Sequence, residues 1–200
     1  MIYQSDSLDT KFQIILVRLE IFKKENKGIN KKGGDIEGYL EEFCRWQSKQ
    51  NPKTSSHPDH WDHGLLLTGV NLYDGLKKYS SVIGNYNSYY LCIWKIRVLL
   101  KTRISTFTFF CSDLKKGLAW VSGMCHPEYS CTINEGHNFE SVYVIAHEMG
   151  HNLGMNHDGE SNSGNHCDSN KYLMSPVLGP GKVTWSSCSN KELQQFLTAR

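Results

Sequence analysis

The stretch AHEMGHNLGMNHDG, residues 146–159, constrains the fold of this chain more than any other part of the sequence. His147 and His151 are four residues apart, so on a helix both imidazoles project from one face and can reach one metal ion. A continuous helix would carry His157 away from that face, but Gly154 can adopt a positive φ and turn the chain back. The stretch therefore predicts a helix that ends at Gly154 and a site of three histidines.

Glu148 lies about 100° around the helix from His147, which places its carboxylate beside the metal ion and not on it. That is the position of a general base for a bound water. Three neutral nitrogens leave one tetrahedral position for water, as in a catalytic zinc site, whereas a structural zinc would usually be closed by a fourth residue. These constraints together disfavour an ordinary histidine-rich helix. The other histidines are expected not to bind zinc: His57, His60, His63, His126, His137 and His166.

The composition describes one ordinary globular domain. The chain has 200 residues and a net charge of +2, so nothing in its charge favours a nucleic-acid partner. Seven cysteines fit an oxidising, extracytoplasmic compartment. The N-terminus has no signal-peptide core, and the longest apolar run, residues 89–100, is too short for a membrane span. Many cysteines without a secretion signal suggest a piece of a longer protein.

The hydrophobic pattern predicts strands and helices in an α/β order. Residues 10–23 are expected to form a buried strand, residues 35–50 a helix capped by Asp35, and residues 61–70 a second strand, parallel to the first. The apolar face of that helix is expected to consist of Ile36, Tyr39, Leu40, Phe43 and Trp46. Short strands follow at 117–125 and 130–136, then a helix at 139–154 with Ser141 as N-cap, and a final helix at 189–197 with Ser189 as N-cap.

The run HEMGHNLGMNHD resembles the extended zinc motif HExxHxxGxxHD of the metzincin peptidases, in their adamalysin/reprolysin branch (M12B), and YLMSP resembles the Met-turn, with Met174 beneath the ligands. Most of the chain is similar to the catalytic domain of the ADAMTS (a disintegrin and metalloproteinase with thrombospondin motifs) enzymes. The stretches that carry this likeness are FCRWQ, HWDHGLLLTGVNLYD, GLAWVSGMCHPEYSCTINEG, MNHDG and WSSCSNKELQQFL. The resemblance implies a single domain, residues 1–200, with a three-layer αβα fold around a mostly parallel twisted sheet.

The function implied by the resemblance is that of a secreted zinc metalloendopeptidase. It would hydrolyse internal peptide bonds of extracellular or matrix proteins through a zinc-bound water, with Glu148 as general base. Asp158 would anchor the loop after His157, although a solvated loop acid is the alternative. Val177 and Leu178 would form the wall of the pocket for the substrate residue after the cut, and the stretch GLAWVSG the strand along which substrate lies. The alternative function is a non-catalytic fragment that keeps the zinc motif.

Further site residues follow from the family pattern alone. Asp62 matches a calcium-binding carboxylate of this branch. Cysteines would pair as Cys44–Cys131 and Cys167–Cys188, leaving Cys125 without a disulfide partner in this chain, while Cys92 and Cys111 pair together or stay reduced. The family's first strand, inside its sheet, and the helix after it have no counterpart here. That absence predicts two unpaired strand edges and a poorly stable chain.

Residues 77–116 match no family motif, although the family usually has a short loop there. No Asp or Glu occurs between Asp74 and Asp113, while aromatic and basic residues are frequent. The segment is an inserted amphipathic element, a cationic surface loop, or a retained intron or gene-model error. The run ISTFTFFCS, which pyrimidine-rich codons would encode, favours the last hypothesis. If translated, the segment is expected to lie beside the active-site cleft.

Overall fold

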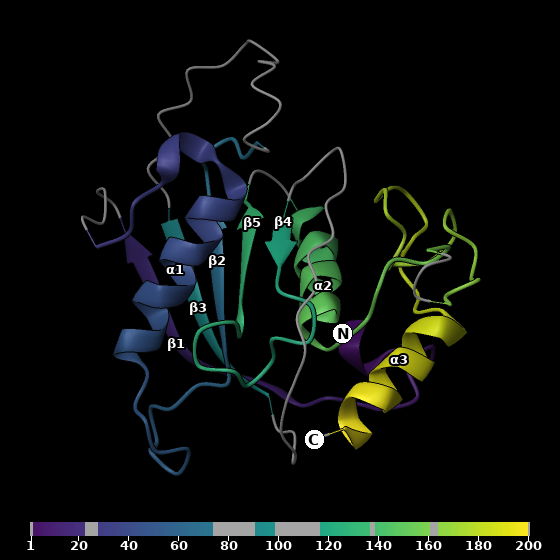
Figure 1. The fold of residues 1–200 in the computed structure, drawn as a ribbon, viewed down its shortest axis with the longest axis horizontal. Coiled ribbons are helices and arrows are strands. Elements are labelled where there is room, and N and C mark those ends of the chain that lie inside the picture. The colour runs from purple at the N-terminus through teal and green to yellow at the C-terminus, as the bar shows by residue number, and fades with distance from the viewer. Residues whose placement is uncertain are drawn as a thin grey trace.

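The structure, a computed structural model, describes residues 2–22, 28–73, 91–98, 117–136, 139–160 and 164–199. Five strands form one sheet with the order β1-β3-β2-β5-β4 (Figure 1). The strands are β1 (Ile14–Phe22), β2 (His63–Thr68), β3 (Leu91–Val98), β4 (Gly117–Ala119) and β5 (Cys131–Glu135). The helices are α1 (Ile36–Gln50), α2 (Ser141–Asn152) and α3 (Ser187–Thr198), with short 3-10 turns at Ile2–Gln4 and Lys32–Gly34.

The sheet is mixed, so the prediction of a mostly parallel sheet is wrong. Only β2 and β5 pair in parallel, whereas β1–β3, β2–β3 and β4–β5 are antiparallel. Strands β1 and β2 run in the same direction, as the strand–helix–strand pattern predicted. They are not neighbours, however, because β3 lies between them and is antiparallel to both.

Strand β3 comes from inside the atypical segment 77–116. Its sequence, LCIWKIRV, is rich in β-branched and aromatic residues, which suit an interior strand. Because β3 pairs on both sides, the sheet formed by the described strands is continuous from β1 to β4, and the prediction of two unpaired strand edges inside it is wrong. Strands β2 and β5 separate β3 from β4. The described part of the segment therefore lies within the sheet, and not beside the cleft as expected; the rest, with Cys111, lies outside the described residues.

Strand β1 is an edge strand and is not buried, which corrects the expectation for residues 10–23. Its side chains include Leu16, Leu19 and Ile21, exposed by 48%, 45% and 57%. The pairing with β3 shifts by one residue between Leu16 and Arg18. This exposure arises because α1 and α2 pack mainly against β4 and β5, at the opposite edge of the sheet, and leave β1 largely uncovered.

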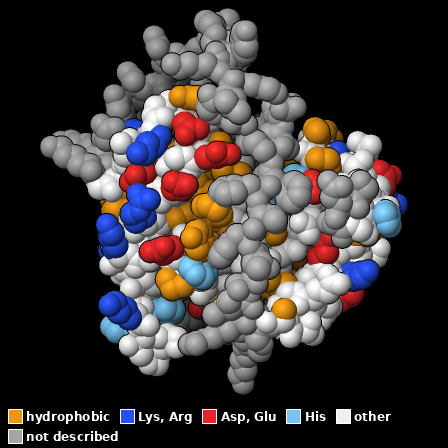
Figure 2. All heavy atoms as spheres, viewed as in Figure 1, with side chains coloured by type: hydrophobic (Ala, Val, Ile, Leu, Met, Phe, Trp, Pro, Cys, Tyr) orange, Lys and Arg blue, Asp and Glu red, His pale blue; other side chains and the backbone are white. Residues whose placement is uncertain are grey.

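Two apolar clusters fill the two faces of the sheet. Adjacent residues of a strand point to opposite faces, so Leu65 belongs to one cluster and Leu66 to the other. The first cluster joins the sheet to the N-terminal segment, α2 and α3, and Figure 1 shows the N-terminus beside α3. The second joins it to α1, whose predicted apolar face is buried except for the partly buried Trp46. On the face seen in Figure 2, acidic and basic side chains are intermixed around α1.

Local capping follows the sequence prediction at one helix and departs from it at two. Asp35 caps α1 as predicted, since its carboxylate accepts from the backbone N–H of Gly38 at 3.2 Å. Ser141 does not cap α2; it is the first helical residue, and its hydroxyl donates to the Glu135 carbonyl at 2.8 Å. Helix α3 begins earlier than predicted, because Ser186 is its N-cap and accepts from the Ser189 N–H at 2.9 Å.

Two disulfides hold these elements together, with the pairing that the family resemblance implied. Cys44–Cys131 joins α1 to β5, and Cys167–Cys188 joins the loop after residue 164 to α3. Cys125 is exposed and takes part in neither disulfide. None of the described helices has the length and apolar character needed to cross a membrane.

Candidate metal centre

The end of α2 determines where the third histidine lies. Gly154, with φ +86°, follows the last helical turn. Its N–H donates to the His151 carbonyl at 2.9 Å, and the Met155 N–H donates to the Gly150 carbonyl at 3.0 Å. These two bonds form a Schellman motif, which requires a left-handed residue at the position of Gly154. The predicted role of Gly154 in ending the helix thus agrees with the geometry, and the turn brings His157 back towards the helix.

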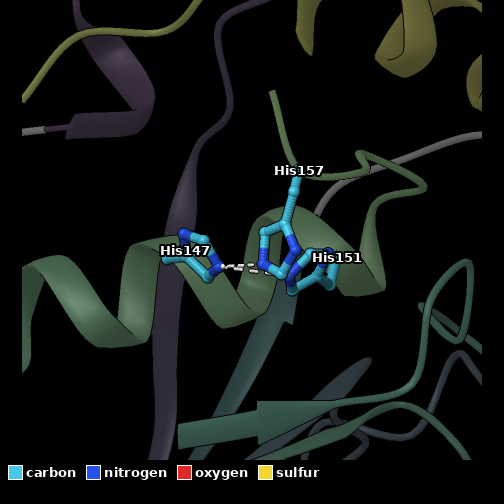
Figure 3. A group of neighbouring side chains, drawn as sticks. All are labelled: His147, His151 and His157. Carbon is cyan, nitrogen blue, oxygen red and sulfur yellow. Dashed lines mark hydrogen bonds between the residues drawn. The ribbon is translucent and has the colours of Figure 1, made fainter. Parts of the chain in front are cut away.

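The imidazoles of His147, His151 and His157 point at one another (Figure 3). Each pair of their Nε2 atoms is 3.1 Å apart, so the three atoms form a regular triangle. All three side chains are buried. These are the residues that the sequence motif predicted would meet, and together they form a group able to hold a metal ion.

The outer nitrogens of the imidazoles are anchored. His147 Nδ1 lies 2.7 Å from the Leu173 carbonyl, and His151 Nδ1 lies 2.8 Å from the Met155 carbonyl. A carbonyl oxygen only accepts, so Nδ1 carries the proton in both rings and Nε2 presents a lone pair. His157 Nδ1 lies 3.0 Å from a carboxylate oxygen of Glu160, which selects the same tautomer. Converging lone pairs repel one another unless a cation lies between them.

The donor set fits zinc. Three imidazole nitrogens around tetrahedral zinc are about 3.3 Å apart, close to the spacing of this triangle, and the carbonyl and carboxylate partners are the usual outer anchors of zinc-binding histidines. Burial, together with the neighbouring His157, lowers the pKa of His147 to about 3, and burial lowers the pKa of His157 to about 4. Burial also lowers the pKa of His151. All three are therefore neutral at pH 7, the form that binds metal.

A cavity of about 440 Å³ opens beside these histidines. His147 and Glu148 line it from α2, and Val177 and Leu178 line it from the loop that follows residue 175. Glu148 is 7% exposed. A carboxylate at the border between the histidines and a largely apolar cavity can exchange a proton with a reactant held there, which is what a general base requires.

Met174 and Asp158 connect this centre to the rest of the fold. Met174 is fully buried, and its sulfur lies 2.7 Å from where a Cβ on Gly150 would be, so the glycine allows it to approach α2. The Asp158 N–H donates to the Met174 carbonyl at 2.8 Å. The Asp158 carboxylate accepts from Ser186 Oγ at 2.6 Å and from Asn165 Nδ2 at 3.3 Å. Asp158 is 1% exposed, which rules out the alternative of a solvated loop acid.

The remaining candidates lie elsewhere. Asp62, with its oxygen 3.9 Å from His60 Nε2, borders a separate cavity near Cys125. His63 is buried between the hydroxyls of Ser130 and Thr132. Within the described residues, the other group with metal-ligand geometry is Asp158 with Cys167 and Cys188, whose sulfurs form a disulfide. None of the remaining described histidines joins the centre, and His137 lies outside the described residues.

Three kinds of contributor to this centre were not predicted from the motif. The carbonyls of Leu173 and Met155 anchor histidines through the backbone, so their side chains give no signal. Glu160 stands three residues after His157, and an acid at that spacing in a turn was the one signal that could have been noticed. Gly150 was within the motif, but its importance lies in the space that it leaves for Met174.

Comparison with known proteins agrees with this geometry. The model of the reprolysin (M12B) family of zinc metalloproteases matches residues 81–200. The chain is 33% identical to the Caenorhabditis elegans protein "A disintegrin and metalloproteinase with thrombospondin motifs adt-1", over 98% of the chain and 11% of that protein. It is 31% identical to member 7 of the same series from Rattus norvegicus and 30% identical to member 3 from Homo sapiens, again over 98% of the chain but 10% and 13% of those proteins.

The chain thus spans about a tenth of the length of the relatives that it matches. The family match covers the whole of α2, the three histidines and the loop with Met174, which are the parts that build the centre. Family and geometry agree on the same residues. The chain belongs to the reprolysin (M12B) family of zinc metalloproteases and is ADAMTS-like.

Proposed function

We propose that this chain is a zinc-dependent metalloendopeptidase that cleaves internal peptide bonds of extracellular proteins. The observation that carries the proposal is the convergence of three Nε2 atoms, 3.1 Å apart, beside a buried carboxylate and a cavity. His147, His151 and His157 would hold the zinc. When bound, zinc supplies a Lewis acid that activates water and polarises the scissile carbonyl.

Glu148 is the proposed general base. It follows His147 directly on α2 and lines the same cavity, so its carboxylate faces the space where water and peptide would meet. There it takes a proton from the attacking water and passes that proton to the leaving nitrogen. Met174, packed against Gly150, would support the histidines from below as the Met-turn residue. Asp158 would fix the loop after His157 through its bond to Ser186.

The substrate would bind as an extended strand along β4. Among the described strands β4 pairs with β5 alone, so a peptide can add to its other edge. The side chain after the scissile bond would then enter the cavity, against Val177 and Leu178. This wall favours an apolar side chain at that position. The two disulfides support an extracellular location for the chain. The role of Asp62 as a calcium ligand stays a prediction from the family pattern.

The proposal is tested by hydrolysis of casein and of a quenched peptide library by the zinc-loaded chain, with and without a chelator. We expect chelator-sensitive cleavage, and a loss of about 100-fold or more in Glu148→Ala, which still binds one zinc. His151→Ala should lose both zinc and activity. Activity that survives Glu148→Ala would overturn the assigned base. Zinc binding without any cleavage by the wild-type chain would favour the non-catalytic alternative.

A further inference from the structure

Gly117 occupies a position where glycine has a local cost. It is the first residue of β4 and is buried. Glycine within a strand is less favourable than alanine by about 0.5–1 kcal/mol, because it loses more backbone entropy on folding. A positive φ would explain its presence, but Gly117 is not one of the described glycines with positive φ. The reason for glycine at this position must therefore be the space that it leaves.

Three side chains fill that space. A Cβ on Gly117 would lie 2.7 Å from Cγ of Glu148, 2.9 Å from Oδ1 of Asn134 and 2.9 Å from Cγ1 of Val144. Contacts under 3.0 Å are essentially never seen for a real Cβ, so at least one of these side chains would have to move. The shortest contact is with the proposed general base, at the middle of its side chain.

Glu148 is also the side chain with the most freedom to move. Asn134 is fully buried, faces Gly117 across the β4–β5 pair, and donates from Nδ2 to the Thr132 hydroxyl at 3.3 Å. Val144 is buried within α2, where a β-branched side chain has essentially one rotamer. Glu148 has three side-chain torsions and borders the cavity, so it can yield into open space.

We propose that Gly117 is a positioning residue for Glu148. By leaving no side chain, it lets the glutamate pack directly on the backbone of β4, and this contact fixes where the carboxylate lies relative to the histidines. The inference rests on the proposed function, since it assigns Gly117 to the reaction through the proposed base. It also links the strand expected to bind substrate with the group expected to move the proton.

The first test compares Gly117→Ala with Gly136→Ala in the zinc-loaded chain. Gly136 immediately follows β5, and a Cβ there would meet its nearest atoms, in Leu67, at 3.5 Å, an ordinary contact. We expect Gly117→Ala to lower kcat by about 10- to 100-fold, because misplacing a catalytic group by an ångström has effects of this size. KM and zinc affinity should stay within about threefold, since the histidines are not touched. Gly136→Ala should leave all three unchanged. An unchanged kcat in Gly117→Ala would overturn the proposal.

The second test needs no activity. Thermal unfolding of the zinc-free protein is measured for Gly117→Ala, Glu148→Ala and the double variant, which together form a double-mutant cycle. Gly117→Ala should lower Tm when Glu148 is present, and should lower it much less in Glu148→Ala, which has no Cγ to clash. Equal losses in the two backgrounds would show that Asn134 or Val144 is the group in conflict, and would sink the inference. If the wild-type chain cleaves nothing, the proposed function fails, while this cycle still decides whether Gly117 makes room for Glu148.

Discussion

Glu160 is the only side chain, among the described residues, that anchors one of the three converging histidines by its outer nitrogen. His147 and His151 donate from Nδ1 to backbone carbonyls, which no substitution removes. His157 Nδ1 instead lies 3.0 Å from the Glu160 carboxylate. Replacing Glu160 by alanine leaves the three zinc ligands in place, but takes away the group that sets the tautomer and the orientation of one ring.

The size of the effect follows from this geometry. Loss of an outer partner of a zinc-binding histidine typically weakens metal binding about 10- to 100-fold, equivalent to about 1.4–2.7 kcal/mol. Only one ring in three is affected, and the Glu160 side chain is 23% exposed, so water can partly replace it. We therefore expect Glu160→Ala to raise the Kd for zinc by about tenfold. Glu160→Gln keeps an acceptor oxygen and should raise the Kd by about threefold or less.

Competition titration of the zinc-free protein against a chromophoric chelator measures these constants. Glu128→Ala is the matched control, because Glu128 is an exposed glutamate away from the centre. It should bind zinc like the wild type. If Glu160→Ala also binds zinc like the wild type, the carboxylate does not orient His157 and the reasoning is wrong. If Glu160→Gln is as weak as Glu160→Ala, the charge of the carboxylate matters more than its acceptor oxygen.

Three further predictions concern stability. The Cys44–Cys131 disulfide spans 87 residues, and replacing both of its cysteines should lower the free energy of unfolding by about 4.6 kcal/mol. The Cys167–Cys188 disulfide spans 21 residues, and the same change there should lower it by about 3.3 kcal/mol. Chemical unfolding measures both losses, and the reverse order would contradict the loop-entropy argument. Burial lowers the pKa of His63 from 6.5 to about 3, so only the unfolded chain gains its proton as the pH falls below about 6.5. Stability should therefore fall by about 2 kcal/mol from this group between pH 7.5 and 5, and His63→Gln should remove that part of the slope in urea titrations. Gly150→Ala should lower Tm although alanine favours helices, because its Cβ would lie 2.7 Å from the Met174 sulfur; a higher Tm would show that the methionine yields without cost.

The sequence predicted those parts of the fold that depend on near neighbours along the chain. His147 and His151, at i and i+4, indicate a helix, and Gly154 indicates where that helix ends and the chain turns back. All of these signals lie within a dozen residues of one another. The Asp35 cap and the buried face of α1 follow from local pattern in the same way. Three serines, Ser186, Ser187 and Ser189, stand near the start of α3, and which of them accepts the free N–H depends on how the preceding loop approaches the helix. At α2 the tertiary structure places Ser141 inside the helix, where its hydroxyl donates to the Glu135 carbonyl.

The order and direction of the strands could not be predicted from the sequence, for a physical reason. The alternation of apolar and polar residues that marks a strand can be read from its own sequence. The strand that it pairs with, and whether the two are parallel, depend on contacts with segments far along the chain. Nothing in residues 91–98 indicates that they lie between β1 and β2, antiparallel to both. Because the composition of residues 77–116 differs from both flanks, the sequence predicts an inserted element, a surface loop or an untranslated segment there, and no strand of the sheet. The exposure of β1 follows from that same arrangement, since it leaves β1 at an edge that the described helices leave largely uncovered.

What the sequence by itself determined is the chemistry of the centre: three imidazoles that can meet at one metal ion, and a glutamate beside them. The tertiary structure decided how that chemistry is held. Glu160 and two backbone carbonyls orient the rings, and Gly117 and Gly150 leave the space in which Glu148 and Met174 pack. A ligand can be recognised by its type and spacing. The space in which a ligand side chain packs, and the hydrogen-bond partner of its outer nitrogen, are supplied by other strands and loops. They are in place only once the chain has folded.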